Sequence, residues 1–355
     1  MRLAIVGTGL IGCSVALAAR EKLGAGATGW DPDPDSLAAA AERGALTPTA
    51  SLADAVAQAE VVFVAAPVAE LGQIVEQVLS LVGPDVLVTD VGSVKRGVVN
   101  ANRDPRFVGG HPLAGREIGG AAHAQPDLFE GATWYLTPTE TTAGVQLERA
   151  FRLLTDLGAR PRVLSAEVHD QILATVSHLP HVFANLLVTE AGATLAAEGE
   201  PLPAIGPSFR DSTRVAGAPS SIWVDIYRAN SDAIVERLRR VEADLAKFRA
   251  MLEADDSDAI KDWNELAAAE HRRLLVEGLD SEKTTSISVR VPNQSGVLAE
   301  IALTLGGAGI DLTDLQLHPA ADRATGTIVL WVPQGEQAER AIGLIAELGH
   351  SVSEV

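Results

Sequence analysis

Cysteine is almost absent from this chain, because Cys13 is the one cysteine among 355 residues. A single thiol excludes any disulfide within the chain, and so little cysteine is typical of proteins from a reducing compartment. We therefore expect a cytoplasmic location. The sequence is 47% hydrophobic, and its length predicts two or three domains with cores of their own.

Positive charge is also scarce, since 28 Lys and Arg residues stand against 47 Asp and Glu residues. The resulting formal net charge of −19 would repel phosphate backbones and anionic lipid headgroups. Neither nucleic acid nor a membrane is therefore expected as a partner.

Long apolar runs are few. The segment that follows Met1-Arg2, LAIVGTGLIGCSVALAA, has the charge and apolarity of a signal peptide, but its glycine spacing favours a different use. No other run approaches the roughly 18 apolar residues that a membrane span needs. We expect no membrane-spanning helix.

The glycines of this first segment have the spacing of a dinucleotide-binding turn. Residues 2–6 predict a short strand, and Gly7-Thr8-Gly9-Leu10-Ile11-Gly12 follows at once and opens a helical segment. In this fingerprint the first glycine allows a tight turn, the second lets backbone approach a pyrophosphate, and the third lets the helix pack on the strand. The spacing alone occurs by chance, but the strand before it and the helix after it supply the expected context.

Asp31 closes the next predicted strand, residues 27–30, and lies 19 residues after Gly12. A carboxylate there accepts hydrogen bonds from an adenosine ribose, whereas a 2′-phosphate would be repelled. No Arg or Lys occurs from Asp31 to Ala41 to offset that repulsion. The sequence predicts NAD rather than NADP as the cofactor; the alternative is a structural turn with a surface aspartate.

Strands and helices alternate up to about residue 165, which predicts a Rossmann-type, doubly wound α/β domain with a parallel sheet. Further strands are expected at 60–66, 85–91, 107–110, 132–137 and 160–164, with helices at 36–43, 68–81 and 143–157. Ser93 follows one of these strands, and His111 follows another. Because carboxyl ends of parallel strands meet at one edge of a sheet, we expect a hydroxyl beside an imidazole in the ligand crevice.

Residues 166–280 are predicted to be almost entirely helical. Apolar residues recur there at spacings of four and three, at Ile234, Leu238, Val241, Leu245, Phe248 and Leu252. Such a heptad seam must be buried, either against the next predicted helix, 258–277, or against a second copy of the chain. The seam does not decide between an intrachain hairpin and a homodimer.

Two short segments stand out in this helical region. In Ser177-His178-Leu179-Pro180-His181 two histidines share a helix face, but without a third ligand they make a poor metal site. The segment 208–214, SFRDSTR, places two arginines beside small hydroxyl residues, and Trp223 follows it. Arginine in such a setting suits bidentate capture of a carboxylate. Structural roles, with His bonding to backbone and Arg paired to Asp211, explain these segments equally well.

The last segment, 284–355, is expected to form a separable unit. Strands at 285–291, 310–317, 326–332 and 351–355, with helices at 296–305 and 337–348, give the βαββαβ order of a ferredoxin-like unit. Its loop Asn293-Gln294-Ser295-Gly296 leads into a helix whose free N–H groups suit an α-carboxylate. An open edge of its sheet would be covered by pairing in a dimer. We expect binding or regulation here rather than catalysis.

Together these motifs resemble the prephenate/arogenate dehydrogenase family of tyrosine biosynthesis. The resemblance rests on Gly7–Gly12 with Asp31, DVGSVK at 90–95, GGHPLAGRE at 109–117, SHLPH at 177–181, and FRDSTR at 209–214 with Trp223. Residues 284–355 resemble an ACT domain, with 291–298 as its first strand-to-helix loop. One departure is Gly206-Pro207-Ser208, where the family commonly has a glycine cluster.

The resemblance implies NAD-dependent oxidative decarboxylation of prephenate, with arogenate as the alternative substrate. His111 is then the catalytic base, and Ser93 orients its ring and contacts the nicotinamide region. The further site residues implied are Arg214 as the carboxylate clamp, His181 and Trp223 in the substrate pocket, and Glu117 as a gate or pairing partner. His178 and Arg210 are taken as structural. An imidazole base predicts an acidic limb of the pH profile with an apparent pKa of about 6 to 7.

The expected organisation is a dinucleotide-binding domain at 1–165, a helical substrate and dimerisation domain at 166–280, and an ACT-like domain at 284–355 with tyrosine as its effector. Two other functions remain open. A different Rossmann dehydrogenase, of the hydroxyacid or imino-acid type, would share the N-terminal motif without needing the arginine segment. A non-enzymatic, NAD-responsive amino-acid sensor would account for the ACT-like segment.

Overall fold

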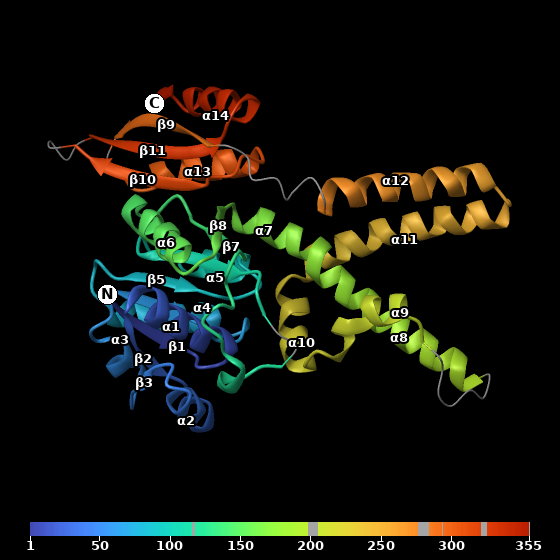
Figure 1. Cartoon of the computed structure of the whole chain (residues 1–355), viewed down its shortest axis with the longest axis horizontal. Helices are drawn as coiled ribbons and strands as arrows, with labels where there is room; N and C mark the ends of the chain where they lie inside the picture. Colours follow the sequence, from blue (N-terminus) through green and yellow to red (C-terminus); the bar gives the residue numbers. More distant parts are fainter. Residues whose placement is uncertain (116–117, 198–204, 276–283, 293, 321–324, 355) are drawn as a thin grey trace.

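The computed structural model describes residues 1–115, 118–197, 205–275, 284–292, 294–320 and 325–354. Figure 1 shows a sheet with flanking helices in blue to green, a set of long helices beside it, and a small red and orange sheet above it.

An eight-stranded sheet forms the N-terminal part, in the order β3-β2-β1-β4-β5-β6-β7-β8. The strands are β1 Arg2–Val6, β2 Gly26–Trp30, β3 Thr47–Pro48, β4 Val61–Val64, β5 Leu87–Asp90, β6 Phe107–Pro112, β7 Thr133–Thr137 and β8 Arg160–Val163. The first six follow the strand order of a Rossmann fold, whose ligands bind where the order reverses, here between β1 and β4. The predicted Rossmann-type domain is confirmed.

Helices cover both faces of this sheet. They are α1 Leu10–Leu23, α2 Pro34–Glu42, α3 Leu52–Val56, α4 Leu71–Leu81, α5 Arg96–Ala101 and α6 Gly144–Asp156. Leu3 and Ile5 belong to one apolar cluster and Ala4 and Val6 to another, because alternate side chains of a strand point to opposite faces. Strands buried on both faces are therefore apolar without alternation, as β4 is.

The sheet is not parallel throughout, and the prediction of a wholly parallel sheet is wrong at one edge. Strand β7 runs antiparallel to β6, with His111 opposite Tyr135, and β8 runs parallel to β7. The described part of the connection between β6 and β7 contains only the short 3-10 turn η1, Ala121–His123. Without a crossover helix the chain returns directly along β6, which gives an antiparallel neighbour.

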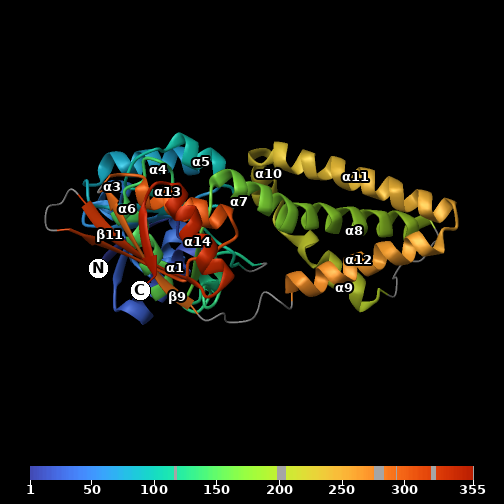
Figure 2. The ribbon, with the colours of Figure 1, turned by 90° about the horizontal axis from the view of Figure 1, so that it is seen from above.

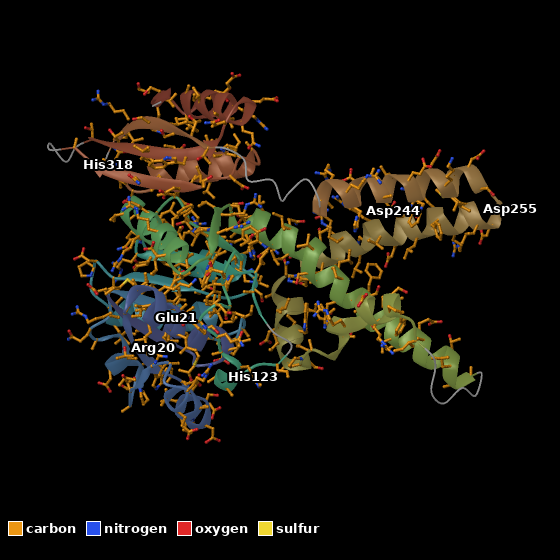
Figure 3. The ribbon with its side chains drawn as sticks, in the orientation of Figure 1. Arg20, Glu21, His123, Asp244, Asp255 and His318 are labelled. Carbon is orange, nitrogen blue, oxygen red and sulfur yellow. The ribbon has the colours of Figure 1, made fainter. Side chains whose placement is uncertain are left out.

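Long helices form the middle part. α7 Ala166–Leu173, the π-helical turn η2 Ala174–His178 and α8 Leu179–Ala197 are continuous; α9 Pro207–Thr213, the 3-10 turn η3 Arg214–Gly217, α10 Ser220–Ala229, α11 Ser231–Glu253 and α12 Ser257–Leu275 follow. α11 and α12 form a hairpin that projects from the rest of the chain (Figures 1 and 2). Asp255, labelled at its tip in Figure 3, has a φ of 52° in the turn between the two helices.

The hairpin buries only part of the predicted heptad seam. Ile234 is buried against Ala174 in the body of the protein, and Phe248 contacts Trp263 of α12, with ring centroids 4.7 Å apart. Leu245 and Leu252 remain 56% and 55% exposed. The intrachain hairpin is therefore present, and it leaves apolar side chains of the seam uncovered.

The helical run Ala166–Ala197 is long and apolar enough to cross a membrane by length and composition. The expectation that no such run exists beyond the N-terminus is therefore wrong. The most apolar stretch of this run is 28% buried within the chain. Core helices of soluble proteins can have the same length and composition, so the run is weak evidence for a membrane span. Its exposed side chains include Leu186, Leu187 and Val188.

The C-terminal part is a four-stranded antiparallel sheet with two helices. Its elements are β9 Thr284–Pro292, α13 Val297–Gly307, β10 Asp314–Pro319, β11 Thr325–Pro333, α14 Glu336–Glu347 and β12 Ser351–Glu354, with the sheet order β10-β11-β9-β12. The predicted order of strands and helices is present.

This C-terminal part packs on the N-terminal part of the chain, and the expectation of a separable unit stays a prediction. α13 and α6 contribute to one continuous apolar cluster. Gly306 of α13 lies so close to β8 that a Cβ there would be 2.1 Å from the carbonyl oxygen of Val163. Leu317 N–H of β10 donates to Glu148 of α6 at 3.0 Å. The edge strand β10 is thus covered within the same chain (Figure 1).

Candidate active site

A cavity of about 1000 Å³ lies beyond the carboxyl ends of β1, β4 and β5 and beside the end of β6. One wall is made by the loops that follow these strands, including Gly9 and Ser93, together with His111. The other wall comes from the helical part and includes Ser177, Arg214 and Trp223. The cavity therefore lies between the nucleotide-fold sheet and the helices.

The glycine turn has the geometry that its fingerprint predicts. Gly7 has a φ of 95°, and a Cβ at this position would lie 2.3 Å from the carbonyl oxygen of Ala65. A Cβ at Gly12 would lie 2.2 Å from the carbonyl oxygen of Gly7. At Gly9 a Cβ would meet no atom within 4 Å. α1 begins after Gly9 without a side-chain cap, and Leu10 and Ile11 line the cavity. Open space in front of uncapped N–H groups fits a pyrophosphate.

Asp31 follows β2 and is held against the glycine turn, outside the cavity wall. Its Oδ2 accepts hydrogen bonds from the N–H of Thr8 at 2.6 Å and from the Thr8 hydroxyl at 3.1 Å. Its Oδ1 accepts the N–H of Asp33 at 2.9 Å. These three donors fix a carboxylate beside the turn, as the dinucleotide fingerprint requires.

A buried ion pair joins the two loops that carry Ser93 and His111. Lys95 Nζ contacts Asp90 Oδ2 and donates to the carbonyl oxygen of Gly110 at 2.8 Å. Asp90 also accepts the N–H of Gly92 at 2.8 Å and that of Gly110 at 3.1 Å. Gly92 directly precedes Ser93, and Gly110 directly precedes His111. The Lys95–Asp90 ion pair therefore fixes the distance between these two predicted site residues. The sequence motif contained Lys95 but gave it no role.

His111 lies within β6, which extends past the predicted end at Gly110, and it is 8% exposed. Its Nδ1 is 2.8 Å from Nε2 of His169. Ser93 lines the cavity, but the contact that orients the His111 ring comes from His169. The role that the resemblance implied for Ser93 stays a prediction.

His169 and its neighbour Asp170 were not predicted from the sequence to belong to the site. Both lie on α7 and are fully buried, and His169 Nδ1 is 2.7 Å from Asp170 Oδ1. The available signal was that His169 and Asp170 lie at helical spacing from the apolar Ala166 and Leu173, with which they share the buried face of α7. Pattern alone could not show that this face meets β6.

The pKa of His111 is held well below its usual value of 6.5. Burial is the main cause, and His169, the Lys95 ammonium and His178 act in the same direction. The imidazole is therefore neutral at pH 7, which is the form that accepts a proton. The acidic limb expected at about pH 6 to 7 consequently moves to lower pH.

Trp223 is held from behind by the two histidines of the SHLPH segment. His181 stacks on it with ring centroids 3.5 Å apart and an interplanar angle of 4°, and His181 Nδ1 is 2.5 Å from the Tyr227 hydroxyl. His178 meets the same indole edge-on and has its Nδ1 3.2 Å from Asn230 Nδ2. His181 is not among the side chains that line the cavity; it lies behind Trp223, and its expected contact with the substrate stays a prediction.

Ser177 of the first unusual segment and Arg214 and Trp223 of the second all line the cavity, so the two segments of the helical region meet at one site. Arg214 begins η3, directly after α9. Arg210, one turn earlier on α9, is exposed and lies outside the cavity wall. Glu117 lies outside the described residues.

Comparisons with known proteins agree with this geometry. Residues 15–163 match the family model "Prephenate dehydrogenase, nucleotide-binding domain", and residues 165–266 match "Prephenate dehydrogenase, dimerization domain". The prephenate dehydrogenase of Bacillus subtilis (strain 168) is 30% identical over 353 residues, which cover 95% of this chain and 93% of that relative. The chain belongs to the prephenate dehydrogenase family.

Solved structures resemble this prephenate dehydrogenase family member over most of its length. The prephenate dehydrogenase of A. aeolicus, in complex with hydroxyphenyl propionate and NAD+, has a TM-score of 0.72 and 28% identity, covering 77% of this chain and 98% of that one. Synechocystis arogenate dehydrogenase has a TM-score of 0.67 and 25% identity, covering 78% and 100%. The resemblance to the prephenate/arogenate dehydrogenase family is confirmed.

Proposed function

We propose that this protein oxidises prephenate with NAD+, converting both to 4-hydroxyphenylpyruvate, CO2 and NADH. One observation carries the proposal: a single cavity is walled by the glycine turn, His111, Arg214 and Trp223. A relative solved with NAD+ and hydroxyphenyl propionate, and the family model for a nucleotide-binding domain, support it.

The residues around the glycine turn fit NAD. Backbone at Gly9 and the N–H groups of Leu10 and Ile11 would hold the pyrophosphate, while Asp31 would bind the ribose hydroxyls and repel a 2′-phosphate. Ser93 would contact the nicotinamide region. When bound, the cofactor supplies the acceptor for the hydride.

The residues of this chain perform the remaining work. Arg214 binds a substrate carboxylate, and the Trp223 indole, held by His181, packs beside the substrate ring. His111 takes the proton of the substrate hydroxyl as its carbon is oxidised, and CO2 leaves from the ring carboxylate. The proton then returns to the oxygen of the phenol product, so His111 ends the cycle neutral. Aromatisation drives the reaction.

The test is NADH absorbance with prephenate and with arogenate, each with NAD+ and with NADP+. We expect NADH formation with a higher kcat/KM for prephenate and with NAD+. Turnover of another hydroxyacid alone would favour the different Rossmann dehydrogenase, and no turnover of any substrate would favour the amino-acid sensor. A preference for NADP+ would contradict the role of Asp31.

We further propose three functional parts, 1–165, 166–280 and 284–355, in a cytoplasmic homodimer. The description of residues 165–266 as a dimerization domain supports the dimer. The exposed apolar side chains Leu186, Leu187, Leu245 and Leu252 support it as well, because a second copy would remove them from water. The lone Cys13, which is buried, fits a reducing compartment.

We also propose that residues 284–355 form an ACT-type regulatory domain with tyrosine as effector. The βαββαβ order and the antiparallel sheet support the domain type. In the predicted effector loop, however, Gly296 N–H donates to the carbonyl oxygen of Thr142 at 3.0 Å. An effector carboxylate must displace that carbonyl or use neighbouring N–H groups. Asn293 of the loop lies outside the described residues.

Calorimetry tests the effector on the intact chain. Tyrosine is titrated into protein saturated with prephenate in the absence of cofactor, so that tyrosine cannot enter the catalytic cavity. We expect saturable binding of about one tyrosine per chain. No heat and no thermal shift with tyrosine, phenylalanine or tryptophan would leave residues 284–355 with an assembly role only.

A further inference from the structure

A buried chain of three side chains connects the candidate base to a carboxylate. His111 Nδ1 lies 2.8 Å from His169 Nε2, and His169 Nδ1 lies 2.7 Å from Asp170 Oδ1. Their exposed fractions are 8%, 0% and 0%. Of the three, His111 lines the cavity. Hydrogen bonds so well shielded from water constrain the position of each proton.

Asp170 is the fixed end of this chain, and it is ionised. Burial opposes its charge, but the hydrogen bonds from His169 and from the N–H groups of Lys95 and Arg96 outweigh burial and lower its pKa. The two N–H donors lie 2.8 Å and 3.0 Å from the carboxylate oxygens. Arg96 Nε adds a contact at 3.2 Å. A carboxylate with these donors can only accept hydrogen bonds.

The protons of the two imidazoles follow from this fixed end. Because Asp170 only accepts, His169 must carry its proton on Nδ1, and burial keeps that ring neutral by lowering its pKa. Neutral His169 therefore offers a bare Nε2, which accepts from His111 only if His111 carries its own proton on Nδ1. The remaining nitrogen of His111, Nε2, then holds the lone pair.

We infer that His169 and Asp170 are positioning residues that fix His111 in the tautomer whose Nε2 is the base. This inference rests on the proposed function, because it assigns the proton-accepting atom of the same reaction. His169 contacts His111 and not the cavity, so it acts through the base.

The positioning chain depends on the junction between the nucleotide-fold sheet and the helices. Arg96, at the start of α5, pairs with Asp170 of α7 and with Asp232 of α11. Asn230 Nδ2 donates to the backbone oxygen of Asp170 at 2.7 Å. The tyrosine ring of β7, Tyr135, meets His169 edge-on with centroids 5.5 Å apart. His169 is thus held from both sides of the junction.

Two substitutions of His169 separate its two hydrogen bonds. His169→Gln places an amide oxygen near the position of Nε2 and so keeps an acceptor for His111. His169→Asn places its amide near the position of Nδ1 and so keeps a partner for Asp170 but leaves His111 without its acceptor. We expect kcat to fall at least ~100-fold in the Asn variant and to stay within ~10-fold in the Gln variant, with KM values little changed.

The tautomer is measured independently of activity by ¹⁵N NMR of imidazole nitrogens in the intact chain, with the His111 signals assigned from His111→Asn. At pH 7 we expect His111 to show a protonated Nδ1 and a bare Nε2. A protonated Nε2 in the wild-type protein, or equal kcat values for folded Gln and Asn variants, would overturn the inference. If the Asn variant does not fold, the wild-type spectrum decides. A wrong substrate assignment would leave that spectrum unchanged, so the two failures are distinguishable.

Discussion

His111→Asn is expected to lower kcat with prephenate by roughly 10²–10⁴-fold, the range typical of a lost general base. Asparagine places an amide N–H near Nδ1, which preserves the contact to His169, and removes Nε2. Binding of NAD, measured by calorimetry, should persist because the glycine turn and Asp31 are untouched. His318→Asn is the matched control, since His318 is an exposed histidine on β10 (Figure 3).

The pH profile adds a second readout on the same variant. Because the pKa of His111 lies well below 6.5, the wild-type enzyme keeps its neutral base down to that lower pKa. Its kcat/KM should fall only as the pH drops through the folded value. In His111→Asn this acidic limb should be absent. Retained activity with an unchanged limb would assign the base to another residue.

Arg214→Lys is expected to weaken prephenate binding by about 1.5–3 kcal/mol, which is roughly a 10- to 150-fold rise in KM. Lysine keeps the charge but loses the planar fork that binds a carboxylate through two parallel hydrogen bonds. The effect should fall mainly on KM, because the reacting carbon and His111 are not altered.

Arg210→Lys is the matched control for this substitution. Arg210 is exposed on α9 and lies outside the cavity wall, so its KM for prephenate should stay at the wild-type value. If KM for both prephenate and arogenate is unchanged in Arg214→Lys, the clamp is another cation. If the two variants raise KM equally, the effect belongs to the segment and not to Arg214.

The residues of the cofactor region could be predicted because their chemistry is local. Gly7 is required by the φ of 95° that it takes in the turn, and Gly12 by its close approach to the carbonyl oxygen of Gly7. Asp31 bonds to Thr8 of the same turn. His111 and Arg214 were found through motifs, and the structure places both at one cavity. His181 was also found through a motif, and the structure places its ring against Trp223.

Contacts between distant parts of the chain were not predicted. His111 and His169 are 58 residues apart in sequence, and no periodicity shows that the buried face of α7 meets β6. The antiparallel direction of β7 was not predicted either, because it depends on a connection from β6 whose described part has no crossover helix. The packing of the C-terminal part was not predicted either, because its pattern of strands and helices does not show the face that α13 buries on β8 and α6.

The sequence by itself determined the Rossmann-type elements, the glycine turn with its carboxylate, the histidine and arginine of the cavity, and the family. Each depends on residue type and short-range spacing, which fix local backbone conformation and hydrogen bonding. Only the tertiary structure decided which groups share a site: His169 behind His111, Lys95 between two loops, His181 behind Trp223, and α13 against β8. These depend on how buried faces pack, and close packing brings together residues that no spacing along the chain connects.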